Sequence, residues 1–104
     1  MGYNVRLTQE ARSDLDDAVT YITERLSNRA AAESLITEFT EKLQLLAASP
    51  EINKLCENPR LRKNAYRRFV IGNYIVFYKI SEIDKTVYIM RMIYGKRDYL
   101  KFFD

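Results

Sequence analysis

The chain has 104 residues, of which 47% are hydrophobic and 30% charged, which fits a single globular domain spanning residues 1–104. One cysteine and no histidine exclude an internal disulfide, histidine-ligated zinc, and catalysis of the Ser–His–Asp or Cys–His kind. No apolar run approaches the roughly 20 residues that span a bilayer, and no signal-peptide stretch opens the chain. We therefore expect a cytoplasmic protein that uses no membrane, metal or cofactor.

The net charge of +3 is unevenly distributed along the chain. Residues 1–58 carry six lysines and arginines against ten aspartates and glutamates, whereas residues 59–104 carry eleven against four. This division predicts a basic surface on the C-terminal part of the fold and an anionic partner for it. The alternative is that the basic residues only keep a small domain in solution.

The first half of the chain predicts a strand and two helices. Residues 3–7 alternate apolar and polar side chains, which is the period of a half-buried strand. Thr8 fits the N-cap of a helix of about five turns, whose apolar stripe is Ala11, Leu15, Ala18, Val19, Ile22 and Leu26. Ser27-Asn28 interrupts this helix, and a second stripe follows at Ala32, Leu35, Ile36, Phe39, Leu43 and Leu46. Pro50 should end the second helix near Ser49, so the two helices form an antiparallel hairpin.

The second half predicts a loop and three strands. Residues 50–60 are expected to form the loop, and residues 65–71, 73–81 and 86–94 are rich in valine, isoleucine and aromatic residues. Tight hairpins at Gly72-Asn73 and at residues 82–85 join these strands. A tail of one helical turn is expected over residues 96–104. The predicted fold class is α+β, in the order β-α-α-β-β-β, with the helical hairpin packed on a mainly antiparallel sheet.

The predicted strands are apolar on both faces. Residues 75–78 and 88–94 have largely apolar side chains in both alternating sets, whereas a sheet open to water on one face alternates more cleanly. The second face should therefore be covered by another protein or by the tail, through Leu100, Phe102 and Phe103. The lone Cys56 is expected to be a half-buried structural residue rather than a nucleophile, because it has no base partner.

Several segments together resemble the RelE/ParE toxin superfamily. They are YNVRLTQEARSDLDDAVTYI, NRAAAESLITEFTEKLQLLAASP, YRRFVIGNYIVFYKI and VYIMRMIYGKRDYLKFF, and they cover nearly the whole chain. The resemblance implies the toxin of a type II toxin–antitoxin pair, silenced by a cognate antitoxin protein. Members of the superfamily act either by cutting mRNA on the ribosome or by inhibiting DNA gyrase, so the resemblance implies one of these two mechanisms.

The nuclease pattern is incomplete in this chain. Ile75 stands where nuclease members have an arginine, and Phe103 stands where they have a tyrosine. If the chain were nonetheless a ribosome-dependent mRNA endonuclease, the resemblance would assign catalysis to Arg68, Lys96, Arg97 and Tyr99. The gyrase-inhibitor pattern fits better, in the strand Tyr74–Tyr78, in Arg91 and in Arg97-Asp98. A domain that simply binds nucleic acid is a third interpretation, and it predicts steeply salt-dependent binding without growth arrest.

The residues expected to contact the target are Arg67, Arg68, Arg91, Tyr94, Lys96 and Arg97. Adjacent strand residues face opposite ways, so Arg67 and Arg68 cannot both serve one site. Arg91 is expected to share its face with Val87, Ile89 and Ile93, where a charge must be either functional or paired, for example with Asp98. The wide helical stripes predict that the antitoxin docks on Leu15, Ile22, Phe39 and Leu43, as a helix in a groove or as an added strand.

Overall fold

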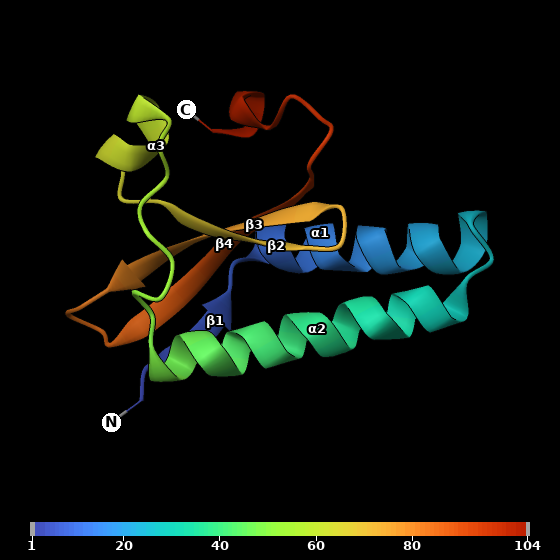
Figure 1. The fold of residues 1–104 in the computed structure, drawn as a ribbon, viewed down its shortest axis with the longest axis horizontal. Helices are drawn as coiled ribbons and strands as arrows, with labels where there is room; N and C mark the ends of the chain where they lie inside the picture. The colour runs from blue at the N-terminus through green and yellow to red at the C-terminus, as the bar shows by residue number, and fades with distance from the viewer. Residues whose placement is uncertain (1, 104) are drawn as a thin grey trace.

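Two long helices cover one face of a four-stranded sheet in this computed structural model, which describes residues 2–103 (Figure 1). The strands are β1 (Asn4–Leu7), β2 (Arg67–Ile71), β3 (Tyr74–Ser81) and β4 (Thr86–Tyr94), arranged in the order β1-β4-β3-β2. β1 runs parallel to β4, and the other two pairings are antiparallel. The predicted α+β class, with a helical hairpin on a mainly antiparallel sheet, is confirmed.

Side-chain caps set the ends of the helical hairpin. The Thr8 side chain accepts a hydrogen bond from the Ala11 N–H at the start of α1 (Gln9–Thr20), which continues through a π-helical turn, η1 (Tyr21–Arg25). Ser27, at a φ of 50°, reverses the chain, and Asn28 caps α2 (Arg29–Ala48). The helix ends at the C-cap Ser49, directly before Pro50, as the sequence predicts.

The loop expected over residues 50–60 contains a short helix at its end. α3 (Pro59–Lys63) starts from Asn58, whose side chain accepts hydrogen bonds from the backbone N–H groups of Arg60 and Leu61. Its sequence signal is an N-cap asparagine followed by proline at the first helical position. The predicted loop therefore ends at Asn58, two residues earlier than expected, because the Asn-Pro pair starts a helix that was not predicted.

Each face of the sheet carries its own apolar cluster. The larger cluster lies between the sheet and the helical hairpin, and Phe39, Leu46, Val76, Tyr78 and Ile89 are among its buried members. On the opposite face, the tail cluster consists of Cys56, Leu61, Phe77, Ile93 and Phe103, with Tyr66, Ile75, Tyr99, Leu100 and Phe102 packed against it. The tail, including the 3-10 turn η2 (Tyr99–Phe102), thus covers the second face, as predicted.

A β-bulge changes which way the end of β4 faces. Phe77 pairs with Arg91 whereas Tyr78 pairs with Ile89, which leaves Met90 as the extra residue of β4. Because of this insertion, Arg91 lies on the tail face with Phe77. The unbroken alternation had predicted a shared face with Val87, Ile89 and Ile93. Arg91 shares the tail face with Ile93 but not with Val87 or Ile89, which lie under the helical hairpin. None of the helices in residues 2–103 has the length and hydropathy that crossing a membrane requires.

Candidate functional site

A cleft of about 700 Å³ lies between the helical hairpin and the end of β4. One wall belongs to α1 and η1, and the other belongs to the start of β3, the end of β4 and the tail. Figure 1 shows the helical hairpin running along one face of the sheet below the tail. The charged and aromatic lining residues are Asp14, Asp17, Tyr21, Tyr74, Arg91, Tyr94, Arg97 and Phe102. Three of the six residues expected to contact the target, Arg91, Tyr94 and Arg97, are thus brought together here.

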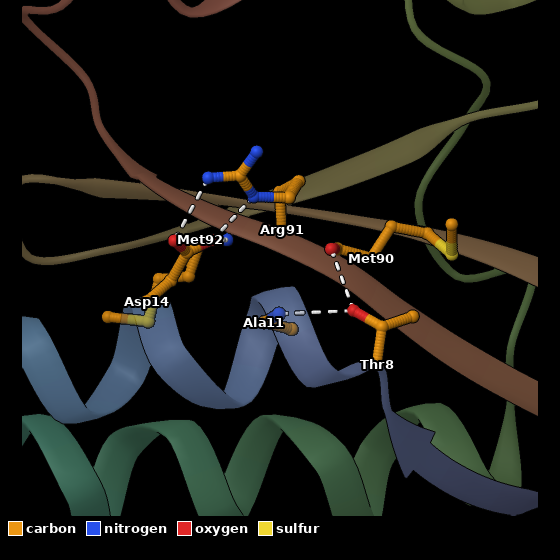
Figure 2. A network of polar contacts seen from close by, with 6 residues as sticks. All are labelled: Thr8, Ala11, Asp14, Met90, Arg91 and Met92. Carbon is orange, nitrogen blue, oxygen red and sulfur yellow. Dashed lines mark hydrogen bonds and ion pairs between the residues drawn. The ribbon is translucent and has the colours of Figure 1, made fainter. Parts of the chain in front are cut away.

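Arg91 is held in a two-pronged ion pair with Asp14 (Figure 2). Its Nε lies 2.7 Å from Asp14 Oδ2, and its Nη2 lies 3.0 Å from Oδ1. The side chains are 22% and 15% exposed respectively, so the pair is shielded but reachable from the cleft. The hydrogen bond to Asp14 raises the pKa of Arg91 above its ordinary value, although burial opposes this. The partner of Arg91 is therefore Asp14, and the expectation of a salt bridge to Asp98 was wrong.

α1 also supplies hydrogen bonds to an edge of β4 that β1 leaves uncovered. β1 ends at Leu7, opposite Ile89. The Thr8 N–H then donates to the Ile89 carbonyl and the Thr8 hydroxyl to the Met90 carbonyl, each at 3.0 Å. The Met92 N–H donates to Asp14 Oδ2 at 2.9 Å. Figure 2 shows α1 lying along this part of β4, with Thr8 and Asp14 directed at it.

Sequence reasoning missed Asp14. The signal available was indirect, because a charge in the apolar strand at residues 86–94 requires a partner. Nothing in the sequence selects Asp14 over Asp16 or Asp17, which lie in the same turn of the same helix.

Three cations surround the ring of Phe102 in the tail. The guanidinium carbons of Arg91 and Arg97 lie 4.9 and 5.0 Å from the ring centroid, and Lys101 Nζ lies 5.9 Å from it. These distances are in the range of cation–π contacts. Within residues 2–103, no carboxylate lies at ion-pair distance from Arg97 or Lys101. Three positive charges therefore lie around the Phe102 ring beside the cleft, and Asp14 neutralises one of them, that of Arg91.

The remaining predicted basic residues lie elsewhere. Arg67 faces the loop after α2, where its guanidinium donates to the Asn53 carbonyl at 2.6 Å and lies 3.7 Å from Glu51. Arg68 points to the opposite face, and its Nη1 lies 3.4 Å from the Tyr99 hydroxyl. Lys96 is exposed in the turn after β4. Arg67 and Arg68 are thus separated by the sheet, as the strand period predicts.

The two altered nuclease positions both belong to the tail cluster. Phe103 is 8% exposed, and its ring packs edge-on against Phe77 and Tyr66, with centroid distances of 4.9 Å to each. Ile75 is half-buried against the same cluster. No group of three or more histidine, cysteine, aspartate or glutamate side chains in residues 2–103 is placed to hold a metal ion.

The residues expected to bind an antitoxin are largely occupied by the domain itself. Ile22 and Phe39 are 9% and 4% exposed and belong to the core under the helical hairpin. Leu15 and Leu43 are half-buried against the same core. A partner cannot reach Phe39 without opening the fold, whereas Ile22 lines the cleft with the small part of it that is exposed. Docking of the antitoxin on Leu15, Ile22 and Leu43 stays a prediction. The apolar side chains that remain accessible are Tyr21, Leu26, Ile36, Leu45, Ile52, Val70 and Ile83.

The helical hairpin packed on a small sheet is an α+β fold that also occurs in chains of toxin–antitoxin systems. The fold matches a chain of the chromosomal ParDE toxin–antitoxin system of P. aeruginosa, with a TM-score of 0.70 at 15% identity, covering 90% of this chain and 97% of that one. It also matches a chain of the RelBE2 toxin–antitoxin complex of Mycobacterium tuberculosis, with a TM-score of 0.59 at 25% identity, covering 90% and 92%.

Sequence similarity identifies the family. The model of the ParE toxin of type II toxin–antitoxin systems matches residues 5–99. Toxin ParE1 of Caulobacter vibrioides is 28% identical over 95 residues, which cover 91% of this chain and 95% of that protein. The chain belongs to the ParE toxin family.

Proposed function

We propose that this ParE-family toxin arrests growth by binding and inhibiting DNA gyrase, and that a cognate antitoxin protein neutralises it. The surface assigned to the target is the cleft wall formed by Arg91, Tyr94 and Arg97, with Lys96 beside it. Family membership supports the toxin and antitoxin roles, and the arrangement of the tail cluster supports the choice of target.

One observation carries the choice of an inhibitor over a nuclease. RNA cleavage through the 2′-hydroxyl requires a general base, a general acid and positive charge at the scissile phosphate. The positions that would supply two of these groups hold Phe103, which is buried in the tail cluster, and Ile75, which is half-buried against it. Neither side chain can transfer a proton or bind a phosphate.

Ribosome-dependent mRNA cleavage is kept as the second candidate because of Arg68 and Tyr99. Their side chains lie 3.4 Å apart, so a phenol and a cation stand together on the tail face. A tyrosine beside an arginine can serve as a proton-transfer group. This candidate therefore places the chemistry on a different surface from the cleft.

The two candidates are separated by assaying the purified protein and three variants. Gyrase supercoiling and cleavage of mRNA on ribosomes are measured for the wild type, Arg97→Ala, Tyr99→Phe and Arg62→Ala. Arg62 is an exposed arginine of α3 outside the cleft and serves as the charge-matched control. We expect the wild type to inhibit supercoiling by gyrase and to leave mRNA intact. Of the three variants, only Arg97→Ala should inhibit gyrase more weakly. Cleavage of mRNA that Tyr99→Phe abolishes would instead establish the nuclease.

A further inference from the structure

We infer that the cleft takes an acidic segment of a protein, whose carboxylate lies between Arg91 and Arg97 beside the ring of Phe102. This inference rests on the proposed function and deepens it, because the segment is assigned to the target enzyme.

Arg91 is oriented before any ligand arrives. A guanidinium has five N–H donors, and Asp14 occupies one on Nε and one on Nη2. Asp14 is itself fixed by the Met92 N–H, so the pair cannot rotate freely. The donors that remain are on the edge of the guanidinium that Figure 2 shows pointing away from Asp14. A planar edge of this kind binds a carboxylate in a two-pronged fashion.

Arg97 and Lys101 add positive charge that no carboxylate within residues 2–103 pairs with. Both lie over the Phe102 ring that Arg91 also contacts, so an anion beside this ring would be close to three cations. Arg97 lines the cleft with Arg91, whereas Lys101 lies on an exposed part of the tail. An anion entering the cleft therefore meets Arg91 and Arg97 first.

The opposite wall argues against a nucleic acid. It presents Asp17 beside Asp14, together with the apolar side chains of Ile22 and Leu26. A phosphate backbone carries a negative charge at every nucleotide and would run against these two carboxylates. A peptide can place one carboxylate against the arginines and apolar side chains against Ile22 and Leu26. Tyr74 and Tyr94, whose rings meet edge-on at 5.7 Å, complete an aromatic wall for such a segment.

The target, rather than the antitoxin, is assigned to the cleft because the domain offers other apolar surfaces for a second partner. Val70, on the edge strand β2, is 55% exposed, and Ile36 and Leu45 on α2 are 43% and 46% exposed. None of these three residues lines the cleft. An antitoxin can therefore bind outside the cleft, which leaves the two arginines to an acidic target.

The ligand chemistry is tested by NMR with two polyanions of different backbone. Poly-L-glutamate and a single-stranded oligonucleotide are titrated into the intact toxin, and the Nε–H signals of the arginines are followed. We expect poly-L-glutamate to shift the signals of Arg91 and Arg97, and the oligonucleotide to bind at least about tenfold more weakly there. Arg97→Glu should weaken poly-L-glutamate binding about tenfold or more, while Lys63→Glu, an equal charge change on α3, changes it less than about twofold.

Several outcomes would overturn the inference. Equal binding of the oligonucleotide at Arg91 and Arg97 would make the occupant a nucleic acid. If folded Arg97→Glu still inhibits gyrase but no longer copurifies with the antitoxin, the occupant is the antitoxin. If the toxin inhibits gyrase but poly-L-glutamate does not shift the Nε–H signals of Arg91 and Arg97, the inference is wrong and the proposed function is retained. Binding of poly-L-glutamate by a protein that leaves gyrase active would refute the proposed function and the gyrase assignment, while retaining the ligand chemistry.

Discussion

Replacing Asp14 with alanine removes the group that joins the helical hairpin to the open edge of β4. The change leaves the Arg91 guanidinium without its counter-ion and the Met92 N–H without an acceptor. Breaking a fully buried ion pair by deleting one partner costs about 3–5 kcal/mol. Because both side chains are about a fifth exposed, water offsets part of this cost, and we expect a loss of about 2–3 kcal/mol.

Thermal and urea unfolding measure this loss directly. For a chain of this length, 1 kcal/mol corresponds to a shift in melting temperature of about 4–5 °C, so Asp14→Ala should melt about 10 °C lower than the wild type. Asp16→Ala is the matched control, since Asp16 is an exposed aspartate of the same helix and should cost less than about 0.5 kcal/mol.

A double-mutant cycle tests the assigned mechanism. Arg91→Met removes the charge while keeping most of the length of the side chain, so the double variant has no orphaned cation. Asp14→Ala/Arg91→Met should therefore be more stable than Asp14→Ala alone, by about 1 kcal/mol. The reasoning is refuted if the two single losses simply add, or if Asp14→Ala unfolds at the same temperature as Asp16→Ala.

Three further predictions concern buried groups. Burial raises the pKa of the Tyr78 hydroxyl above the ordinary value of 10.0, so folding favours its neutral form. This contribution to the free energy of unfolding is fully present below about pH 10 and is lost as the pH rises through the pKa of the folded state. Tyr78→Phe should cost about 1 kcal/mol at neutral pH, because the Pro50 carbonyl loses its donor, and should remove this alkaline loss in urea titrations. Burial likewise raises the pKa of the Cys56 thiol. An aromatic disulfide reagent at about pH 8 should therefore label Cys56 only as fast as the chain unfolds, and immediate labelling would contradict this. Phe103→Ala should destabilise the protein by about 3 kcal/mol in urea and expose the tail to proteolysis.

The ends of the elements were predictable wherever a local residue sets them. Thr8 and Asn28 cap the two long helices, and residues 86–94 form a strand with the predicted bounds. The bulge at Met90 was not predictable, because a strand that is apolar on both faces has no alternation for an inserted residue to interrupt. For the same reason the prediction grouped Arg91 with Val87 and Ile89, which face the helical hairpin, as well as with Ile93, whose face it does share.

The candidate site was only partly predictable for a related reason. Tyr94 and Arg97 are close in sequence and follow the end of one strand, so their proximity follows from the chain itself. Asp14 lies 77 positions before Arg91, and its selection depends on how α1 packs along β4. Sequence reasoning establishes that Arg91 needs a counter-charge, but only the packing of α1 selects one aspartate among several. Phe39 was expected on a docking surface but lies in the core, because a helical stripe that faces the core has the same period as one that faces a partner.

The shortness of β1 explains why an oriented arginine stands at this cleft. The chain turns from strand to helix at Thr8, so β1 covers β4 only as far as Ile89 and the next turns of α1 lie along the remaining edge. The bulge at Met90 then turns Arg91 onto the tail face, within reach of Phe102, while its guanidinium still reaches Asp14 around that edge. A longer β1 would pair with this part of β4 and displace Asp14, and an unbroken β4 would direct Arg91 beneath the helical hairpin. The short strand and the bulge together therefore place a paired, oriented cation at the mouth of the cleft.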